Sequence, residues 1–198
     1  MPASKKSFSF LFITILSLIL ICILFFVHTR STKSITELQK GNELAGRTFQ
    51  INNALQEIVN DINTIETAYL NQSGNALAGN TAETGDAILK MKKNSNTIIE
   101  LTKNFTNYEI VRNFSGSINR KINFFNTISK SGNLAVTAKE LIFAPGNSIL
   151  NDSIYMSALS IQIEAENELQ KKINQNFTVS KQALLISRVL TILAISAI

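Results

Sequence analysis

Residues 44–69 read LAGRTFQINNALQEIVNDINTIETAY, and this stretch decides the fold. Its seam positions alternate in steps of four and three without a slip: Leu44, Thr48, Ile51, Leu55, Ile58, Ile62, Ile65 and Tyr69. This heptad spacing is typical of helices that pack at a shallow angle in a bundle or coiled coil. Only two single glycines interrupt residues 31–73, so we predict one long first helix there.

Two further seams follow along the chain. Residues 71–85 are rich in Gly, Asn and Ser and predict a turn. A second helix is predicted from the spacing of Ile88, Met91, Ser95, Ile98, Thr102 and Phe105, with a connection at 104–108. A third is predicted from Val111, Phe114, Ile118, Ile122, Phe125 and Ile128, continuing through Ala135 towards Phe143.

A fourth helix completes the pattern. Pro145-Gly146 is expected to end the third helix, with Asn147 or Ser148 capping the next. The fourth seam comprises Ile154, Ala158, Ile161, Ala165, Leu169, Ile173 and Phe177, and no helix breaker separates it from the apolar C-terminal residues. The predicted fold is therefore all-α: an antiparallel up-down four-helix bundle with long first and last helices, flanked by transmembrane helices.

The N-terminal apolar run has the length of a membrane span. Residues 8–27 carry no charge and only three hydroxyl side chains, which predicts a transmembrane helix. Lys5 and Lys6 precede it and favour a cytoplasmic N-terminus, although basic residues also follow the run. A cleavable signal peptide and a lipoprotein modified at Cys22 are alternatives. The run lacks a small-residue cleavage pattern, and Ile21 precedes the cysteine, so we favour an uncleaved anchor.

The C-terminal residues 183–198 are apolar apart from Ser187, Arg188, Thr191 and Ser196. We interpret them as the start of a second, truncated transmembrane helix. An amphipathic tail lying on the membrane is the alternative, but residues 189–198 have no polar face.

Charge and the counts of histidine and cysteine exclude several classes of function. The formal net charge is +5, yet residues 31–182 carry 15 basic and 14 acidic side chains, and no basic patch that would bind nucleic acid stands out. His28 is the single histidine and Cys22 the single cysteine, so neither a hydrolytic triad nor a zinc site can assemble. No glycine-rich phosphate loop occurs. We therefore predict no catalytic, cofactor-binding or metal-binding residues, and expect this chain not to be an enzyme.

Three residues are candidates for ligand binding. Arg112 and Arg120 lie eight positions apart, so both could face along one stripe of a helix and grip a ligand carboxylate. Tyr69 ends the first seam. The alternatives are two surface arginines and a core tyrosine.

Carboxylates near the end of the fourth helix form a separate group. Glu164 and Glu168 share a helix face, which would suit a cation. A solvated face is favoured, with Lys171 and Lys172 as the helical partners of Glu168.

Three short motifs carry a family resemblance: Ile65-Glu66-Thr67-Ala68, Gly74-Asn75 and Glu164-x-Glu166-x-Glu168-Leu169. Together with two spans around a helical middle, they resemble the all-helical CHASE class of extracytoplasmic sensor domains. Such domains occur in bacterial histidine kinases and cyclases. The chain departs from that family before its first turn, where the usual Arg-Gly-Tyr is missing and the turn is longer. The chemoreceptor-type four-helix bundle is the sister possibility.

The resemblance implies a sensory input module in the bacterial inner membrane. Residues 1–7 would be cytoplasmic, 8–27 transmembrane, 31–182 the extracytoplasmic sensor domain, and 183–198 the start of a truncated second transmembrane helix. A small-molecule or protein stimulus would act through the first and last helices of a homodimer on a cytoplasmic output domain, as in a sensor histidine kinase. A chemoreceptor ligand-binding domain and a non-catalytic membrane adaptor are the alternatives.

Overall fold

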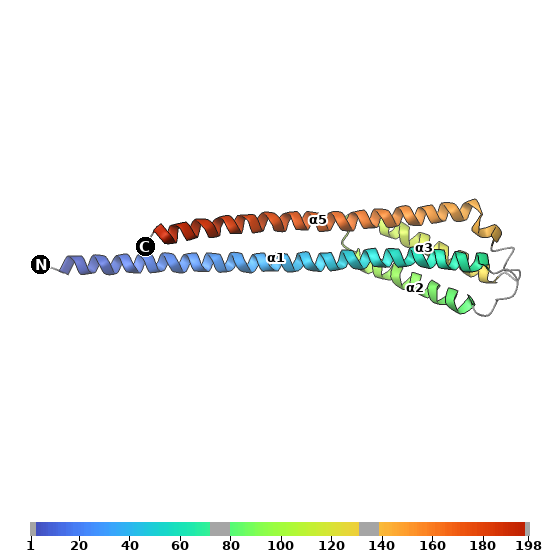
Figure 1. Ribbon diagram of the computed structural model, residues 1–198, viewed down its shortest axis with the longest axis horizontal. Coiled ribbons are helices and arrows are strands. Elements are labelled where there is room, and N and C mark those ends of the chain that lie inside the picture. Colours follow the sequence, from blue (N-terminus) through green and yellow to red (C-terminus); the bar gives the residue numbers. More distant parts are fainter. Residues whose placement is uncertain (1–2, 72–79, 131–138, 197–198) are drawn as a thin grey trace. The chain divides into compact units, whose positions relative to one another are not determined.

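The computed structural model describes the backbone of residues 3–71, 80–130 and 139–196. Side chains are described for these residues except 3–9, 11–13, 16, 80–82, 130 and 189–196. The described part is helical throughout apart from short connections, which confirms the all-α prediction. The long helices are α1 (Ala3–Asn71), α2 (Asn80–Leu101), α3 (Tyr108–Lys130) and α5 (Pro145–Ser196) (Figure 1). Residues 139–142 are helical as well.

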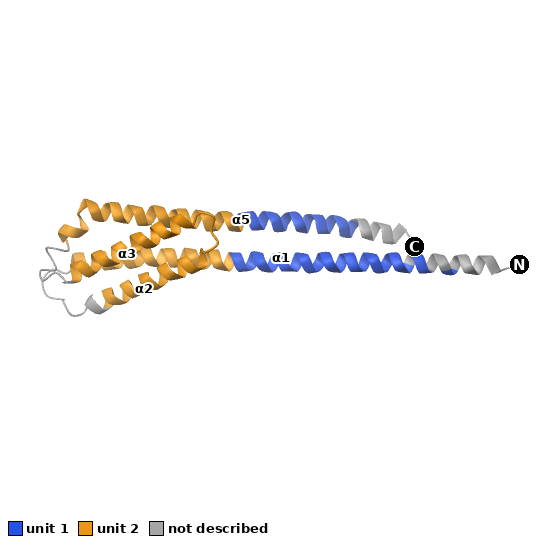
Figure 2. Ribbon diagram, turned by 180° about the vertical axis from the view of Figure 1, so that it is seen from behind, with its two compact units in different colours: residues 1–44, 170–198 blue, residues 45–169 orange. Residues whose placement is uncertain are grey.

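The chain divides into two compact units (Figure 2). Unit 1 comprises residues 1–44 and 170–198, and unit 2 comprises residues 45–169. Helices α1 and α5 each contribute residues to both units, whereas α2 and α3 belong to unit 2 alone.

The core of unit 2 is built on the first seam. Seven of its eight positions, from Thr48 to Tyr69, are buried, and Leu44 at the unit boundary is half-buried. Helices α2, α3 and α5 face it with their own seams, whose buried apolar residues include Met91, Ile98, Phe114, Ile118, Phe125, Ile154 and Ile161. Each such side chain contributes roughly 1.5–3 kcal/mol through removal of apolar surface from water. The heptad prediction is therefore confirmed for most seam positions of this unit, whereas Ile122 is only half-buried.

The connection between α2 and α3 covers residues 102–107, slightly earlier than predicted. Thr102 closes the last turn of α2, because its hydroxyl donates to the carbonyl of Ile98 at 2.6 Å. Arg47 of α1 donates from Nε to the carbonyl of Leu101 and lies 5.5 Å from the Phe105 ring centre. A cation at the carbonyl end of a helix is stabilising, so Arg47 ties α1 to the end of α2.

Helix α5 begins at Pro145 itself, so the predicted cap at Asn147 or Ser148 is wrong. Proline fits the first helical position because its backbone has no N–H to satisfy and its φ is already helical. The carbonyl of Ala144 accepts the first bonds, from the backbone of Asn147 and Ser148. Asn147 thereby lies inside the first turn. Helix α3 ends at Lys130, and its predicted continuation through Ala135 lies outside the described residues.

The predicted seam of α5 is correct up to Leu169 and wrong beyond it. Ile173 and Phe177 are 48% and 69% exposed, whereas Lys172 and Asn176 are half-buried against α1. Two successive steps of four, from 169 to 173 and 177, drift around the helix. Alternating steps of three and four keep 172 and 176 on the contact face. The contact face beyond Leu169 is therefore polar and is formed by Lys172 and Asn176, whereas the apolar Ile173 and Phe177 point away from it.

In unit 1, polar side chains connect α1 and α5. Lys172 pairs with Glu37, and Asn176 donates from Nδ2 to the carbonyl of Glu37 at 3.1 Å. Asn176 approaches the α1 backbone at Gly41, where an added Cβ would lie 2.7 Å from Nδ2. No described side chain of unit 1 is buried.

One helix in the described part of the chain is long and apolar enough to cross a membrane. It is the apolar part of α1 near the N-terminus, and none of that stretch is buried in the fold. A membrane span and a signal sequence both have this character. The predicted second span at 183–198 lies partly outside the described residues.

Candidate functional site

A buried lysine marks the polar centre of unit 2. Lys121 of α3 is fully buried, which is rare for a charged side chain unless it is paired. Its Nζ donates to Oε1 of Glu66 on α1 and, at 2.5 Å, to Oδ1 of Asn147 on α5. A single ammonium group therefore binds side chains of two other helices.

Two asparagines complete the arrangement around Glu66. Asn147 donates from Nδ2 to Oε1 of Glu66 and to the carbonyl of Ile142, each at 3.0 Å. Asn151, one turn further along α5, donates to the same Oε1 at 3.1 Å. We call Glu66, Lys121, Asn147 and Asn151 the Lys121 cluster. It satisfies a buried charge with an opposite charge and amide groups, as the desolvation cost of an isolated ion requires.

Aromatic rings enclose the ammonium group. Lys121 Nζ lies 5.0 Å from the ring centre of Phe124 and 4.9 Å from that of Phe125, within cation–π range. Tyr69 packs beside Phe125 with ring centres 6.2 Å apart, and its hydroxyl donates to the Phe125 carbonyl at 3.4 Å. The cluster therefore lies against the aromatic end of the core.

The pKa values of Glu66 and Lys121 are shifted by different balances of burial and hydrogen bonding. Burial alone would raise the pKa of Glu66, but hydrogen bonds from Asn147, Lys121 and Asn151 outweigh it and leave that pKa below its ordinary value. For Lys121, burial is the largest effect and lowers the pKa, with Glu66 opposing it. Glu66 is thus stabilised as an anion, and as the counter-charge it opposes the lowering of the Lys121 pKa by burial.

The cluster joins α1, α3 and α5 through one acceptor atom. Three donors converge on Oε1 of Glu66, so a shift of any one helix breaks a charge-assisted bond. Asn151 also keeps a buried Oδ1 without a hydrogen-bond partner. An arrangement of this kind favours discrete packings over gradual deformation, because a half-satisfied buried network is costly.

The predicted ligand residues lie apart from one another. Tyr69 is 3% exposed and belongs to the core beside the cluster. Arg120 is exposed and donates to the Ser117 hydroxyl at 3.0 Å. Arg112 is exposed too and lines a surface hollow at the start of α3 with Tyr108, Glu109 and Asn113. The structure gives the two arginines separate neighbours.

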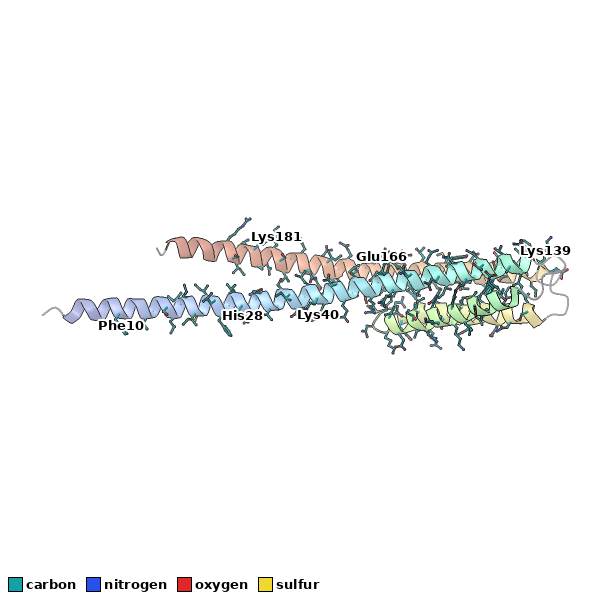
Figure 3. The ribbon with its side chains drawn as sticks, turned by 60° about the horizontal axis from the view of Figure 1, so that its bottom comes forward. Phe10, His28, Lys40, Lys139, Glu166 and Lys181 are labelled. Atoms are coloured by element: carbon teal, nitrogen blue, oxygen red, sulfur yellow. The ribbon has the colours of Figure 1, made fainter. Side chains whose placement is uncertain are left out.

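One of the three glutamate carboxylates of α5, Glu166, has a partner within the helix. Gln162 donates to Glu166 at 2.9 Å. The predicted pairing of Lys172 with Glu168 is wrong, since Lys172 reaches Glu37 of α1 instead. Within residues 3–71, 80–130 and 139–196, no group of three His, Cys, Asp or Glu side chains could hold a metal ion. His28 projects from the exposed surface of α1 (Figure 3).

Lys121 was missed from the sequence, although its spacing contains the signal. Steps of three and four from Val111 lead through Phe114 and Ile118 to position 121, and from there to Phe125 and Ile128. The apolar Ile122 was preferred at that step, but it is only half-buried. A lysine at a strict seam position predicts a buried partner on another helix.

Comparison with known proteins adds no relative. No protein-family model, no curated protein and no solved structure matches the chain.

Proposed function

We propose that the chain is the sensory input module of a bacterial membrane receptor, with residues 45–169 forming an antiparallel four-helix bundle outside the cytoplasm. The apolar residues 8–27 would cross the inner membrane on one side of it, and residues 183–198 would begin a second transmembrane helix on the other. Output would come from a cytoplasmic domain such as a histidine kinase.

One observation carries this proposal. Helices α1 and α5 each contain residues of the packed unit and an apolar terminal run within one uninterrupted helix. A helix transmits displacement along its axis because its hydrogen bonds are internal. A change in the packing of unit 2 would therefore move the membrane-proximal residues of the same two helices.

The Lys121 cluster supplies the element with distinct states that such a relay needs. A stimulus shifts a receptor only when it binds two conformations with different affinity. Around Oε1 of Glu66, α1 is held to α3 and α5 by discrete ionic and amide bonds. Exchanging one donor for another would set a new relative position of these helices.

A chimeric receptor tests the relay. Residues 1–198 are fused to the kinase half of a characterised sensor, and output is read from a reporter gene. Lys121→Met serves as an artificial stimulus because it removes the cation from the cluster. We expect output to change by roughly fivefold, the lower end of typical coupling between sites. Inserting Gly-Gly-Pro after Phe177, which interrupts α5, should abolish that change.

The control insertion places the same Gly-Gly-Pro after Thr106, in the connection between α2 and α3, where no helix is broken. It should preserve the response to Lys121→Met. Immunoblots of membrane fractions check that all variants are present. Equal output from all of these chimeras would refute a signalling role.

The orientation can be measured separately. Alkaline phosphatase is active only outside the cytoplasm, so a fusion after Asn104 should be active and a fusion at the N-terminus inactive. The opposite pattern would place the bundle in the cytoplasm and contradict an extracytoplasmic sensor.

A second candidate, a membrane adaptor that docks a partner, is favoured by an apolar stripe on α5. Ile149, Met156, Leu159 and Ile163 follow steps of seven, three and four and are 68%, 64%, 50% and 49% exposed. In the receptor proposal, a second copy of the chain covers this stripe in a homodimer.

Cysteine cross-linking distinguishes whether a second copy of the chain or another protein covers the stripe. In a Cys22→Ser background, Leu159→Cys should form disulfide-linked dimers in membranes, whereas Gln56→Cys on the exposed face of α1 should not. A monomer that instead cross-links to another protein would favour the adaptor.

A further inference from the structure

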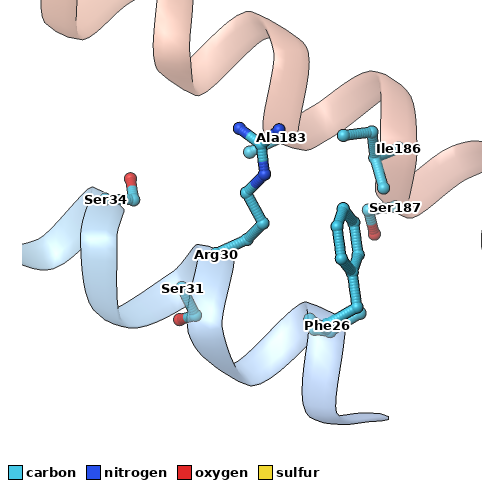
Figure 4. A pocket seen from close by; sticks show the side chains of 8 residues that line it. Phe26, Arg30, Ser31, Ser34, Ala183, Ile186 and Ser187 are labelled. Atoms are coloured by element: carbon cyan, nitrogen blue, oxygen red, sulfur yellow. The ribbon is translucent and has the colours of Figure 1, made fainter. Parts of the chain in front are cut away.

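A crevice lies between α1 and α5 inside unit 1. Phe26, Val27, Arg30, Ser31 and Ser34 line it from α1, and Ala183, Ile186 and Ser187 from α5, around a cavity of about 200 Å³. Figure 4 shows Arg30 extending across towards Ala183, while the Phe26 ring stands opposite Ile186 and Ser187. The crevice therefore has apolar walls, hydroxyl groups and one guanidinium group.

The charged residues in the two segments that line the crevice are all basic. Residues 26–34 and 179–188 contain Arg30, Lys33, Lys181 and Arg188 and no Asp or Glu. Among the described side chains, none of these four forms an ion pair. Arg30 lies 5.6 Å from the Phe26 ring centre and keeps its donors directed at the crevice. Lys181 projects from α5 nearby in the sequence (Figure 3). A ligand of complementary charge for this crevice would be an anion.

Exposed apolar side chains continue from the crevice along α1 towards the N-terminus. Val27, Leu24 and Leu20 follow one face of α1 into the N-terminal apolar run and are exposed. A ligand that satisfies both parts has an anionic group for Arg30 and a hydrocarbon chain for this face. Small molecules that bind by themselves generally need a pocket of about 300–1,000 Å³, so the cavity suits one part of a larger amphiphile.

We propose that the crevice binds an anionic phospholipid of the surrounding membrane. Its phosphate would accept paired N–H donors from Arg30, with the hydroxyls of Ser31 and Ser34 as further donors, and an acyl chain would lie along Val27, Leu24 and Leu20. This inference rests on the membrane placement in the proposed function. Basic pockets between membrane helices on the cytoplasmic side bind anionic headgroups, and the crevice would offer the same chemistry at the opposite face of the bilayer. The lipid would also hold α1 and α5 at a set separation where they leave the bilayer.

Tryptophan quenching tests the site, because the natural chain contains no tryptophan. Leu24→Trp places one reporter a turn away from Val27 without altering the crevice lining. The full chain is reconstituted in phosphatidylcholine vesicles that contain an equal minor fraction of either phosphatidylglycerol or phosphatidylcholine brominated on its acyl chains. We expect the brominated phosphatidylglycerol to be enriched at the reporter by roughly fivefold, the factor typical of one basic side chain at a membrane surface.

Three variants locate the selectivity. Arg30→Gln should abolish the preference for phosphatidylglycerol, and Arg30→Lys should reduce it, because lysine lacks the paired donors. Lys33→Gln removes the same charge from a residue that does not line the crevice, and it should retain most of the preference. Circular dichroism checks that the helices are intact. Equal losses in Arg30→Gln and Lys33→Gln would overturn the inference in favour of a diffuse charge effect.

The remaining outcomes separate this inference from the proposed function. Equal quenching by the two brominated lipids would overturn lipid selection while leaving the membrane placement standing. No quenching by either lipid would overturn the membrane placement as well. Inorganic phosphate, added at constant ionic strength, should leave the quenching unchanged. If it relieved the quenching, the crevice would be a site for free anions.

Discussion

The two units of this chain use the same two helices in opposite ways. In unit 2, α1 and α5 meet α2 and α3 around a continuous apolar core. In unit 1 they meet only each other, through Glu37, Gly41, Lys172 and Asn176, and no described side chain there is buried. Four helices can enclose a core, whereas two leave most of each surface exposed. Unit 1 therefore depends on precise polar contacts and on whatever surrounds it.

The largest effect should come from emptying the core of unit 2. Phe114→Ala removes a side chain that is 1% exposed and should lower the free energy of unfolding by about 3–5 kcal/mol. Phe177→Ala is the matched change at a site that is 69% exposed, and it should cost at most about 0.5 kcal/mol. Denaturant unfolding of the full chain in mild detergent, followed by circular dichroism, measures both. Similar losses would show that unit 1 buries Phe177.

Breaking the Lys121 cluster should come next. Lys121→Met leaves Glu66 without its cation and should cost about 3 kcal/mol, the lower end for a broken buried pair because Glu66 is partly solvated. The double variant Glu66→Met/Lys121→Met should recover much of this loss, since both charges are removed. A double variant no more stable than Lys121→Met would mean that the lysine contributes through packing alone.

The stability of unit 2 should fall in acid because of Glu66. Its pKa is lowered below 4.5 in the folded chain, so its contribution is complete above pH 4.5 and is lost as the pH falls through the folded value. The difference in unfolding free energy between the natural chain and Glu66→Gln should therefore shrink below pH 4.5.

Asp61 provides a control of opposite sign for the acid effect. Burial raises its pKa above 3.8, so ionised Asp61 opposes folding at neutral pH and this penalty disappears in acid. Asp61→Asn should stabilise the chain at pH 7 and have less effect as the pH falls. Parallel pH profiles for Glu66→Gln and Asp61→Asn would contradict both assignments.

The smallest effect should come from a pair of glycines. Gly46→Ala meets no atom within 4 Å and should stabilise α1 by roughly 0.5–1 kcal/mol, the helix propensity gained. Gly41→Ala should gain nothing net, because its Cβ displaces Asn176 from the Glu37 carbonyl and loses a hydrogen bond worth about 1 kcal/mol. Equal stabilisation by both changes would show that α1 and α5 do not approach closely at Gly41.

Sequence spacing predicted the fold best where apolar residues occupy every seam position. From Ile51 to Ile65 the alternation of steps and the burial agree, because one face of the helix is apolar throughout. The same reasoning failed where a polar residue occupies the seam. Hydrophobicity predicts Ile122 at a seam position that Lys121 occupies. In the same way it predicts Ile173 and Phe177 where strict alternation of steps leads to Lys172 and Asn176.

The candidate site could be predicted only in part. Glu66 belongs to a short motif that stands out in the sequence. Its hydrogen-bond partners come from α3 and α5, and the residue spacing within one helix does not specify contacts between helices. The sequence predicts a cap at Asn147 because Pro145-Gly146 resembles a helix end. Its position became clear only with α5 starting at the proline.

The burial of Tyr69 also makes the chain its own optical reporter. The sequence has three tyrosines and no tryptophan, and they differ in exposure: Tyr69 is 3% exposed, Tyr108 43% and Tyr155 38%. Among the side chains that the structure describes, Tyr69 is the one tyrosine that packs against another ring, that of Phe125. The neighbouring Phe124 also faces the Lys121 ammonium group. Near-ultraviolet dichroism of the unmodified protein should therefore come mainly from this one phenol. Any stimulus that rearranges the end of the core would be visible without a label.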